Sequence, residues 1–294
     1  MALSIDNTQT TAFASASSVV VTKPTGLAVG DLMMATIGYI ESGSSRTFTT
    51  PAGWTQVQKR EGLQTPAGGF NGIAVYGKIA DASDVSASNF TFTISGAAQI
   101  AGSITLVDGD IVTSFAGDSE QDETTSGTAS LSFTTAVTPV SKISIVFLSI
   151  VYHDLSLTNP TTVSGYASTP SYTFTEHADI NYKSGSNGGG LSTASSVIAS
   201  TTQITNYSAT ISEAVTTHLG VLTSITGVYD DTGANVFFTT SPANFTSSGT
   251  NDALAPSVLA TETAVANTQS GTGTSPTPWT NESKPSTTWT NETL

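Results

Sequence analysis

The chain has 294 residues, of which 37% are hydrophobic and only 10% are charged, and its formal net charge is -14. Its 22 acidic side chains against 8 basic ones argue against a nucleic-acid partner, because binding to phosphates depends on clustered Lys and Arg. The absence of cysteine excludes disulfides, thiolate chemistry and Cys-ligated zinc.

The first residues predict a strand and a turn. Residues 3–21 alternate weakly between polar and apolar side chains and end in three consecutive valines, which is typical of an opening strand. The segment Lys23–Gly26 contains Pro and Gly at positions that favour a turn. The run Leu32–Ile40 then has apolar side chains on both faces, so we expect a central strand that is covered by a second sheet.

Further strands follow a turn that carries a tryptophan. Trp54 comes directly after Pro-Ala-Gly, where its ring is placed to close one end of an apolar core. Strands are then expected at Ile73–Ile79, Phe90–Ile94 and Gly102–Val107, which are rich in β-branched and aromatic residues.

The same order of features returns in the second half of the chain. The matched segments are Leu32–Ile40 with Ile143–Tyr152, Ala52–Trp54 with Val163–Tyr166, Gly68–Phe70 with Gly188–Leu191, Lys78–Ala80 with Val197–Ala199, Asn89–Ser95 with Asn206–Ser212, and Gly102–Leu106 with Gly220–Ile225. We therefore predict an all-β chain with two tandem β-sandwich domains of the jelly-roll or immunoglobulin-like kind, related by duplication. The domains span residues 1–113 and 114–228, joined through an acidic linker near Phe115–Thr128, and Tyr166 matches Trp54 as a second core plug. The alternative is two unrelated sandwiches whose strands and turns are spaced alike.

The last segment, residues 229–294, is rich in Ser and Thr and is expected to be extended. It ends in a repeat with a period of ten residues, Trp279-Thr-Asn281-Glu and Trp289-Thr-Asn291-Glu. Such a segment has too few apolar residues to fold alone. Regularly spaced tryptophans in polar sequence predict docking onto another surface through Trp279, Trp289, Asn281 and Asn291.

The sequence predicts no enzyme and no cofactor. His153, His177 and His218 lie far apart and do not have metal-ligand spacing. His153 and Asp154 could form a base and its orienting carboxylate, but a solvated strand end is the preferred interpretation. The acidic cluster Asp118–Glu123 lacks the ligand spacing of a calcium loop and is interpreted as a solvated linker. We therefore predict no catalytic residues, no cofactor-binding residues and no metal ligands.

Two features bear on where the protein acts. Residues 1–11 have neither a basic nor an apolar region of the kind found in secretion signals, so we expect no export signal. No apolar run approaches the roughly 18 residues needed to span a bilayer, so we expect no membrane insertion.

Three segments of the first domain resemble a known group of modules. These are Pro24–Leu32 with its Val-Gly-Asp-Leu, Thr50–Thr55 with its Pro-Ala-Gly-Trp-Thr, and Val75–Ala80. The pattern is similar to that of β-sandwich modules in tail, fibre or capsid-appendage proteins of tailed bacteriophages. The second domain departs from it, since Tyr166 replaces the tryptophan and Val-Gly-Asp is missing.

The resemblance implies a non-enzymatic structural protein of a virion, either a capsid decoration or a tail or fibre component, assembled in the host cytoplasm. Its partners would be other virion proteins and copies of itself. The alternative is a carbohydrate-binding adhesin or host-recognition module, in which the loops Glu41–Thr50 and Tyr182–Gly190 would contact a host surface glycan. Trp54 and Tyr166 could then be sugar-stacking platforms, but the core-plug interpretation is preferred for both.

Overall fold

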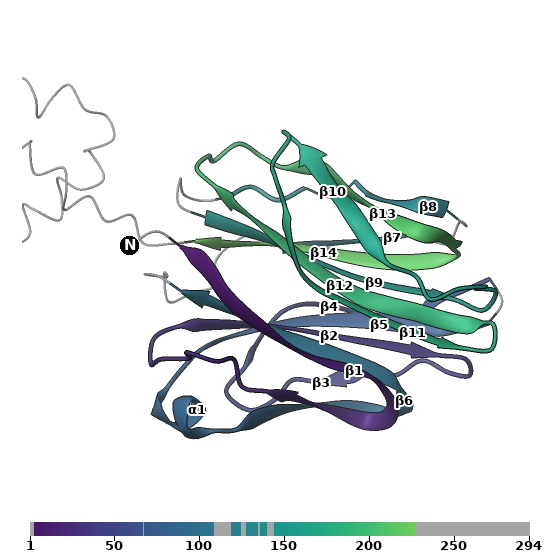
Figure 1. The fold of residues 1–294 in the computed structure, drawn as a ribbon, viewed down its shortest axis with the longest axis horizontal. Helices are drawn as coiled ribbons and strands as arrows, with labels where there is room; N and C mark the ends of the chain where they lie inside the picture. The colour runs from purple at the N-terminus through teal and green to yellow at the C-terminus, as the bar shows by residue number, and fades with distance from the viewer. Residues whose placement is uncertain are drawn as a thin grey trace, which may run out of the picture. The chain divides into compact units, whose positions relative to one another are not determined.

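The computed structural model describes residues 3–66, 68–108, 119–124, 128–134, 136–139 and 144–226, and these residues belong to one compact unit, Met1–Tyr229. They form antiparallel sheets, which confirms the predicted all-β class (Figure 1). The predicted boundary between residues 113 and 114 and the segment 229–294, with Trp279, Asn281, Trp289 and Asn291, lie outside the described residues.

The first half of the chain forms one sheet, here called the first sheet. Its strand order is β1-β6-β2-β5-β4, and β3 also pairs with β6. The bounds are β1 Ser4–Thr22, β2 Leu32–Glu41, β3 Phe48–Thr49, β4 Thr55–Gln64, β5 Phe70–Ile79 and β6 Asn89–Asp108, with a short helix α1 Ala82–Ser86 before β6.

The second half forms two sheets. The second sheet has the order β11-β12-β9-β14-β7, and the third sheet has the order β10-β13-β8. The bounds are β7 Ser119–Thr124, β8 Thr128–Phe133, β9 Ser144–Asp154, β10 Val163–Thr169, β11 Thr175–Ser184, β12 Asn187–Ile198, β13 Thr205–Val215 and β14 Thr217–Thr226.

The two halves have the same strand order. In the first half β2 lies between β5 and β6, and in the second half β9 lies between β12 and β14. The long strand β6 corresponds to β13 and β14 in succession, while its partner β1 corresponds to β7 and β8. The short strands β3 and β10 pair with β6 and β13 in the same way.

The first half closes its core by bending two strands back over its own sheet. The ladder between β1 and β6 has register shifts between Thr11 and Ala14 and between Ala16 and Ser18, where strands can bend sharply. The part of this ladder that lies beyond these register shifts, toward the end of β1 and the start of β6, packs on the face of β2 that carries Met33 and Tyr39. The two strands predicted at Phe90–Ile94 and Gly102–Val107 are therefore one continuous strand, β6.

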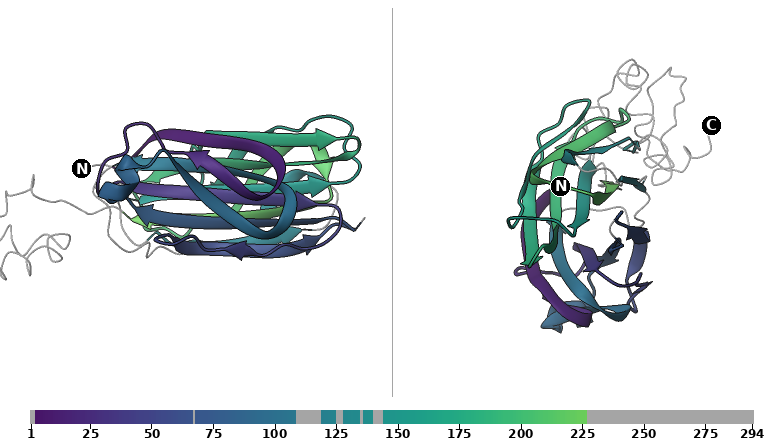
Figure 2. Two further views of the ribbon diagram at one scale, coloured as in Figure 1. Left: turned by 90° about the horizontal axis from the view of Figure 1, so that it is seen from below. Right: turned by 90° about the vertical axis from the view of Figure 1, so that its right-hand side faces the viewer.

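A second apolar interface, here called the seam, joins the halves. Leu32 and Met34 of β2 share one buried cluster with Ile145, Phe147 and further residues of β9 and β14. Figures 1 and 2 show the first sheet packed against the second sheet, with the third sheet on the far side of the second. Strand β2 is thus covered on both faces, as its sequence predicted, and β9 is buried along its whole length.

Several strands that the sequence did not predict lie at sheet edges. Strands β4 and β11 end the first and second sheets, and β7 forms the other edge of the second sheet. Strand β7, Ser119–Thr124, lies inside the stretch that was predicted to be a linker, so these six residues form a strand and not a linker. Charged side chains are common on edge strands because they prevent pairing with other chains, and β7 reads Ser-Glu-Gln-Asp-Glu-Thr.

Candidate functional site

Polar loops from both halves meet at one end of the unit, here called the loop end. Strands β2 and β9 finish there at Glu41 and Asp154, and β12 starts there at Asn187. A Cβ atom placed on Gly69, just before β5, would lie 2.5 Å from the His153 ring and 3.2 Å from the Glu41 carbonyl oxygen. The loops before β5 and after β2 therefore lie beside the end of β9.

Glu41 and Arg46 hold the loop after β2 in place. The carboxylate of Glu41 accepts a hydrogen bond from Arg46 Nη2 at 2.9 Å and another from the backbone N–H of Ser42 at 2.8 Å. Arg46 also donates to the carbonyl oxygen of Ala97 on β6 at 2.8 Å. The loop is thus tied both to its own strand and to the neighbouring one.

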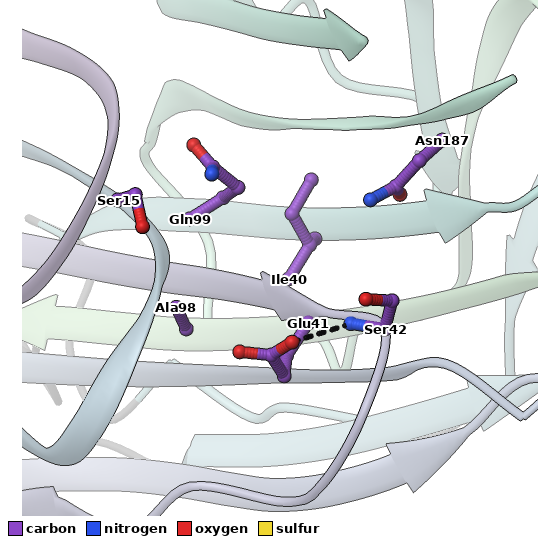
Figure 3. A pocket seen from close by; sticks show the side chains of 7 residues that line it. All are labelled: Ser15, Ile40, Glu41, Ser42, Ala98, Gln99 and Asn187. Carbon is purple, nitrogen blue, oxygen red and sulfur yellow. Dashed lines mark hydrogen bonds between the residues drawn. The ribbon is translucent and has the colours of Figure 1, made fainter. Parts of the chain in front are cut away.

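A shallow depression of about 100 Å³ opens between this loop and the start of β12 (Figure 3). Its lining residues are Ser15, Ile40, Glu41, Ser42, Ala98, Gln99 and Asn187. The amides of Gln99 and Asn187, the neighbouring hydroxyls and the Glu41 carboxylate line the depression with hydrogen-bond donors and acceptors.

His153 supports the depression from inside. Its side chain is fully buried, and its Nε2 lies 2.9 Å from Asn187 Oδ1, so the amide is held with its nitrogen toward the depression (Figure 3). Burial lowers the pKa of His153, which keeps the ring neutral.

The prediction that His153 and Asp154 form a solvated strand end is wrong. Asp154 is buried too, and its carboxylate accepts backbone N–H groups of Ser156 at 2.6 Å and Thr216 at 2.7 Å. These bonds give Asp154 a structural role in closing the loop end, because a carboxylate can satisfy N–H groups that no strand partner reaches.

In both halves a carboxylate holds the first residue of the short strand. In the second half Asp179 Oδ2 of β11 accepts the N–H of Val163 at 3.0 Å. In the first half Glu61 of β4 accepts the N–H of Phe48, and Lys59 Nζ lies 3.1 Å from the same Glu61 oxygen. Burial raises the pKa of Asp179 to about 6, with a smaller contribution from the charge of Glu176.

Replacement of Asp179 by asparagine is expected to stabilise the protein at pH 7.5 by about 1 kcal/mol, after allowance for partial solvent exposure. The pKa of Asp179 is higher in the folded chain than in the unfolded chain, so protonation of Asp179 stabilises the folded state. This contribution to the free energy of unfolding is complete below about pH 4 and is lost as the pH rises through about 6. The asparagine side chain would keep the acceptor without the charge. Thermal unfolding should show a Tm increase of about 2–4 °C at pH 7.5 and almost none at pH 4.

The matched control is Glu61→Gln, which removes a carboxylate that already has a lysine partner. It should not raise the Tm at pH 7.5. An equal increase in both variants would contradict the explanation from buried charge.

The structure places the two predicted core plugs in different surroundings. Trp54 is buried in the first core, with its ring edge-on to Phe90 and Phe92 at centroid distances of 5.6 and 5.1 Å. Tyr166 lies half-buried on β10, and its hydroxyl donates to Glu176 Oε2 at 3.0 Å and contacts Ser192 Oγ.

The residue that corresponds to Trp54 in register is Phe174. Trp54 directly precedes β4, and Phe174 directly precedes β11, where it packs on the second core. The first residues of these two strands, Thr55 and Thr175, pair near the C-terminal end of the next strand, opposite Gly77 and Ser195. Sequence matching missed Phe174 because no Pro-Ala-Gly precedes it.

In the part of the chain that the structure describes, no three or more His, Asp and Glu side chains gather as metal ligands would. Among the same residues no helix is long and apolar enough to cross a membrane.

Comparison with known proteins does not assign the chain to a family. A scan against protein-family models finds no match, and searches of curated proteins and of solved structures also find none.

Proposed function

We propose that the chain is a non-enzymatic structural protein of a tailed-phage virion, either a capsid decoration or a tail or fibre component, that assembles through its C-terminal segment. The bacteriophage class rests on the resemblance of the Val-Gly-Asp-Leu, Pro-Ala-Gly-Trp-Thr and Val-Tyr segments.

The observation that supports an attachment role is the separation of the two ends of the unit. Strand β14 ends at Thr226, opposite Ser144 at the start of β9, and the loop end lies at Asp154, where β9 finishes. Eleven residues of strand separate these ends, which corresponds to roughly 33 Å. Thr226, the last residue that the structure describes, therefore lies at the end of the unit remote from the polar loops.

Deletion of residues 275–294 is expected to abolish incorporation into particles, because it removes both Trp-Thr-Asn-Glu repeats. The Tm and circular dichroism of the truncated protein should stay unchanged, since the described strands all end by Thr226. The measurement is the amount of protein in gradient-purified particles. A variant with Trp279 and Trp289 both replaced by Ala tests the tryptophans alone, and normal incorporation of either variant would refute the docking role.

A recognition function is the second candidate, and one observation favours it. The loops Glu41–Thr50 and Tyr182–Gly190, from different halves, meet at the depression lined by Glu41, Ser42 and Asn187. The loop end is thus a composite surface on a rigid scaffold, which is where binding residues commonly lie.

If the loop end binds a glycan, Asn187→Ala should reduce retention of the full chain on an array of bacterial surface polysaccharides by about tenfold, the effect of losing one or two well-placed hydrogen bonds. The control is Asn89→Ala, an exposed asparagine at the start of β6. Absence of binding by the unmodified chain, or an equal loss in both variants, would exclude the depression as a glycan site.

A further inference from the structure

The contacts across the seam are reciprocal between corresponding strands. Strand β4 lies beside β7, and its counterpart β11 lies beside β1, the counterpart of β7. In the same way β5 lies beside β9, and β12 lies beside β2. Strands β2 and β9, which correspond to each other, are also in contact. Reciprocity of this kind defines an interface with twofold symmetry.

The strand register identifies which residues correspond. Tyr39 lies opposite Gly72 on the neighbouring strand, and Tyr152 lies opposite Gly190. In each half the glycine leaves room for the ring, because an added Cβ would collide with it. Counting back along β2 and β9 from the two tyrosines, Thr36 corresponds to Ser149, Gly38 to Val151 and Ile40 to His153.

Two of these residues meet their own counterparts. Thr36 Oγ1 and Ser149 Oγ are hydrogen-bonded at 2.8 Å and are both fully buried. A Cβ on Gly38 would lie 3.1 Å from Val151 Cγ2. A position touches its own counterpart only near a twofold axis, so the axis runs between the middle of β2 and the middle of β9.

The loop end repeats the pattern away from the axis. Gly69 lies under His153, and the counterparts of these two residues, Asn187 and Ile40, both line the depression. Corresponding residues therefore lie near each other at two places along the strands, as a twofold relation requires.

We propose that the seam is an isologous dimer interface enclosed within one chain, so that the seam face of each half fits a second copy of the same half. The pair Gly38 and Val151 makes the pairing of two different halves more favourable than the pairing of two identical halves. The Cβ position of Gly38 is 2.6 Å from Leu191 Cδ1, so the space above this glycine is filled by Leu191 and Val151. Two glycines facing each other would leave a void, and two valines would collide, whereas the mixed pair fills the seam.

Exchange of the two residues in the full chain tests the twofold geometry. Gly38→Val alone should lower the Tm by roughly 10 °C through overpacking, and Val151→Gly alone by a similar amount through a cavity and a flexible strand residue. The double variant should lose less stability than the sum of the two single losses, because removing the Val151 side chain relieves one of the two close contacts of the new valine, while the contact with Leu191 remains. Additive losses in the double variant would overturn the assignment of Gly38 and Val151 as counterparts.

Cleavage of the chain between the halves tests the partner. A protease site is inserted between residues 113 and 114 of the full chain, and the folded protein is cut. The two fragments should co-elute at the mass of the intact chain on size-exclusion chromatography with light scattering. Separation into two folded monomers would overturn the proposal.

A cysteine at the axis reports pairing with a second copy, since the chain has no cysteine of its own. The cut Thr36→Cys protein is held in dilute urea so that its fragments exchange partners, and it is then oxidised. A disulfide-linked dimer of the N-terminal fragment should form and be detected by non-reducing mass spectrometry. The exposed control Val29→Cys should give at least fivefold less. Equal yields from the two variants would show that the seam face does not select its own copy.

Discussion

Replacement of Gly190 by alanine is expected to lower the free energy of unfolding by about 3 kcal/mol, at the upper end of overpacking effects. The added Cβ would collide with the Tyr152 ring and lie 2.8 Å from the Ile180 carbonyl oxygen, and backbone cannot yield as a flexible side chain does. The ring is also fixed at its far end, because Tyr152 Oη donates to the Thr161 carbonyl oxygen at 3.1 Å and accepts from Thr161 Oγ1 at 2.9 Å.

The measurement is thermal or urea unfolding, in which the Tm should fall by roughly 6–12 °C. Gly43→Ala is the control, because its nearest neighbour would be Glu41 Oε1 at 3.7 Å, an ordinary contact. If the two variants lost equal stability, the loss would be a general effect of replacing glycine, and the tyrosine–glycine contact would carry no special weight.

Trp54→Ala should cost about 4 kcal/mol, because a large ring is removed from a closed core that cannot collapse around the space. The ring edges of Trp54 meet both Phe90 and Phe92, so the substitution also removes two aromatic pairs. Trp54→Phe should cost about half as much, since Phe174 serves the same position in the second half.

Urea unfolding followed by intrinsic fluorescence and circular dichroism measures both variants, with Val29→Ala as a control at an exposed position, where the change should stay within about 0.5 kcal/mol. A loss below about 1 kcal/mol for Trp54→Ala would mean that Trp54 does not close the core.

The buried strands could be predicted from sequence because their composition reflects their surroundings. The runs Leu32–Ile40 and Ile143–Tyr152 are apolar on both faces in the sequence, and the structure buries the strands β2 and β9 that it describes there. The edge strands gave no such signal: β4 reads Thr-Gln-Val-Gln-Lys-Arg-Glu-Gly-Leu-Gln, which resembles a loop, and only its pairing with β5 makes it a strand.

The composite loop end could be predicted only in part. The sequence identified Glu41–Thr50 and Tyr182–Gly190 as candidate binding loops, but their proximity follows from packing between halves, which no local pattern encodes. His153 was misread for the same reason: its burial depends on Gly69 and Asn187, residues far away in the sequence.

The seam also constrains how the protein can be made. The last strand of the first half ends at residue 108, but the strands that cover its seam face continue to residue 226. At about 5–20 residues per second, a ribosome needs roughly 6–24 s to add the intervening chain. During that interval Leu32, Met34 and Val107 are exposed to water on each nascent chain, and ribosomes on one messenger carry several such chains close together. The yield of soluble protein should therefore depend on how soon the second half leaves the ribosome, or on a chaperone that covers the seam face of the first half. The stability of the finished fold should matter less.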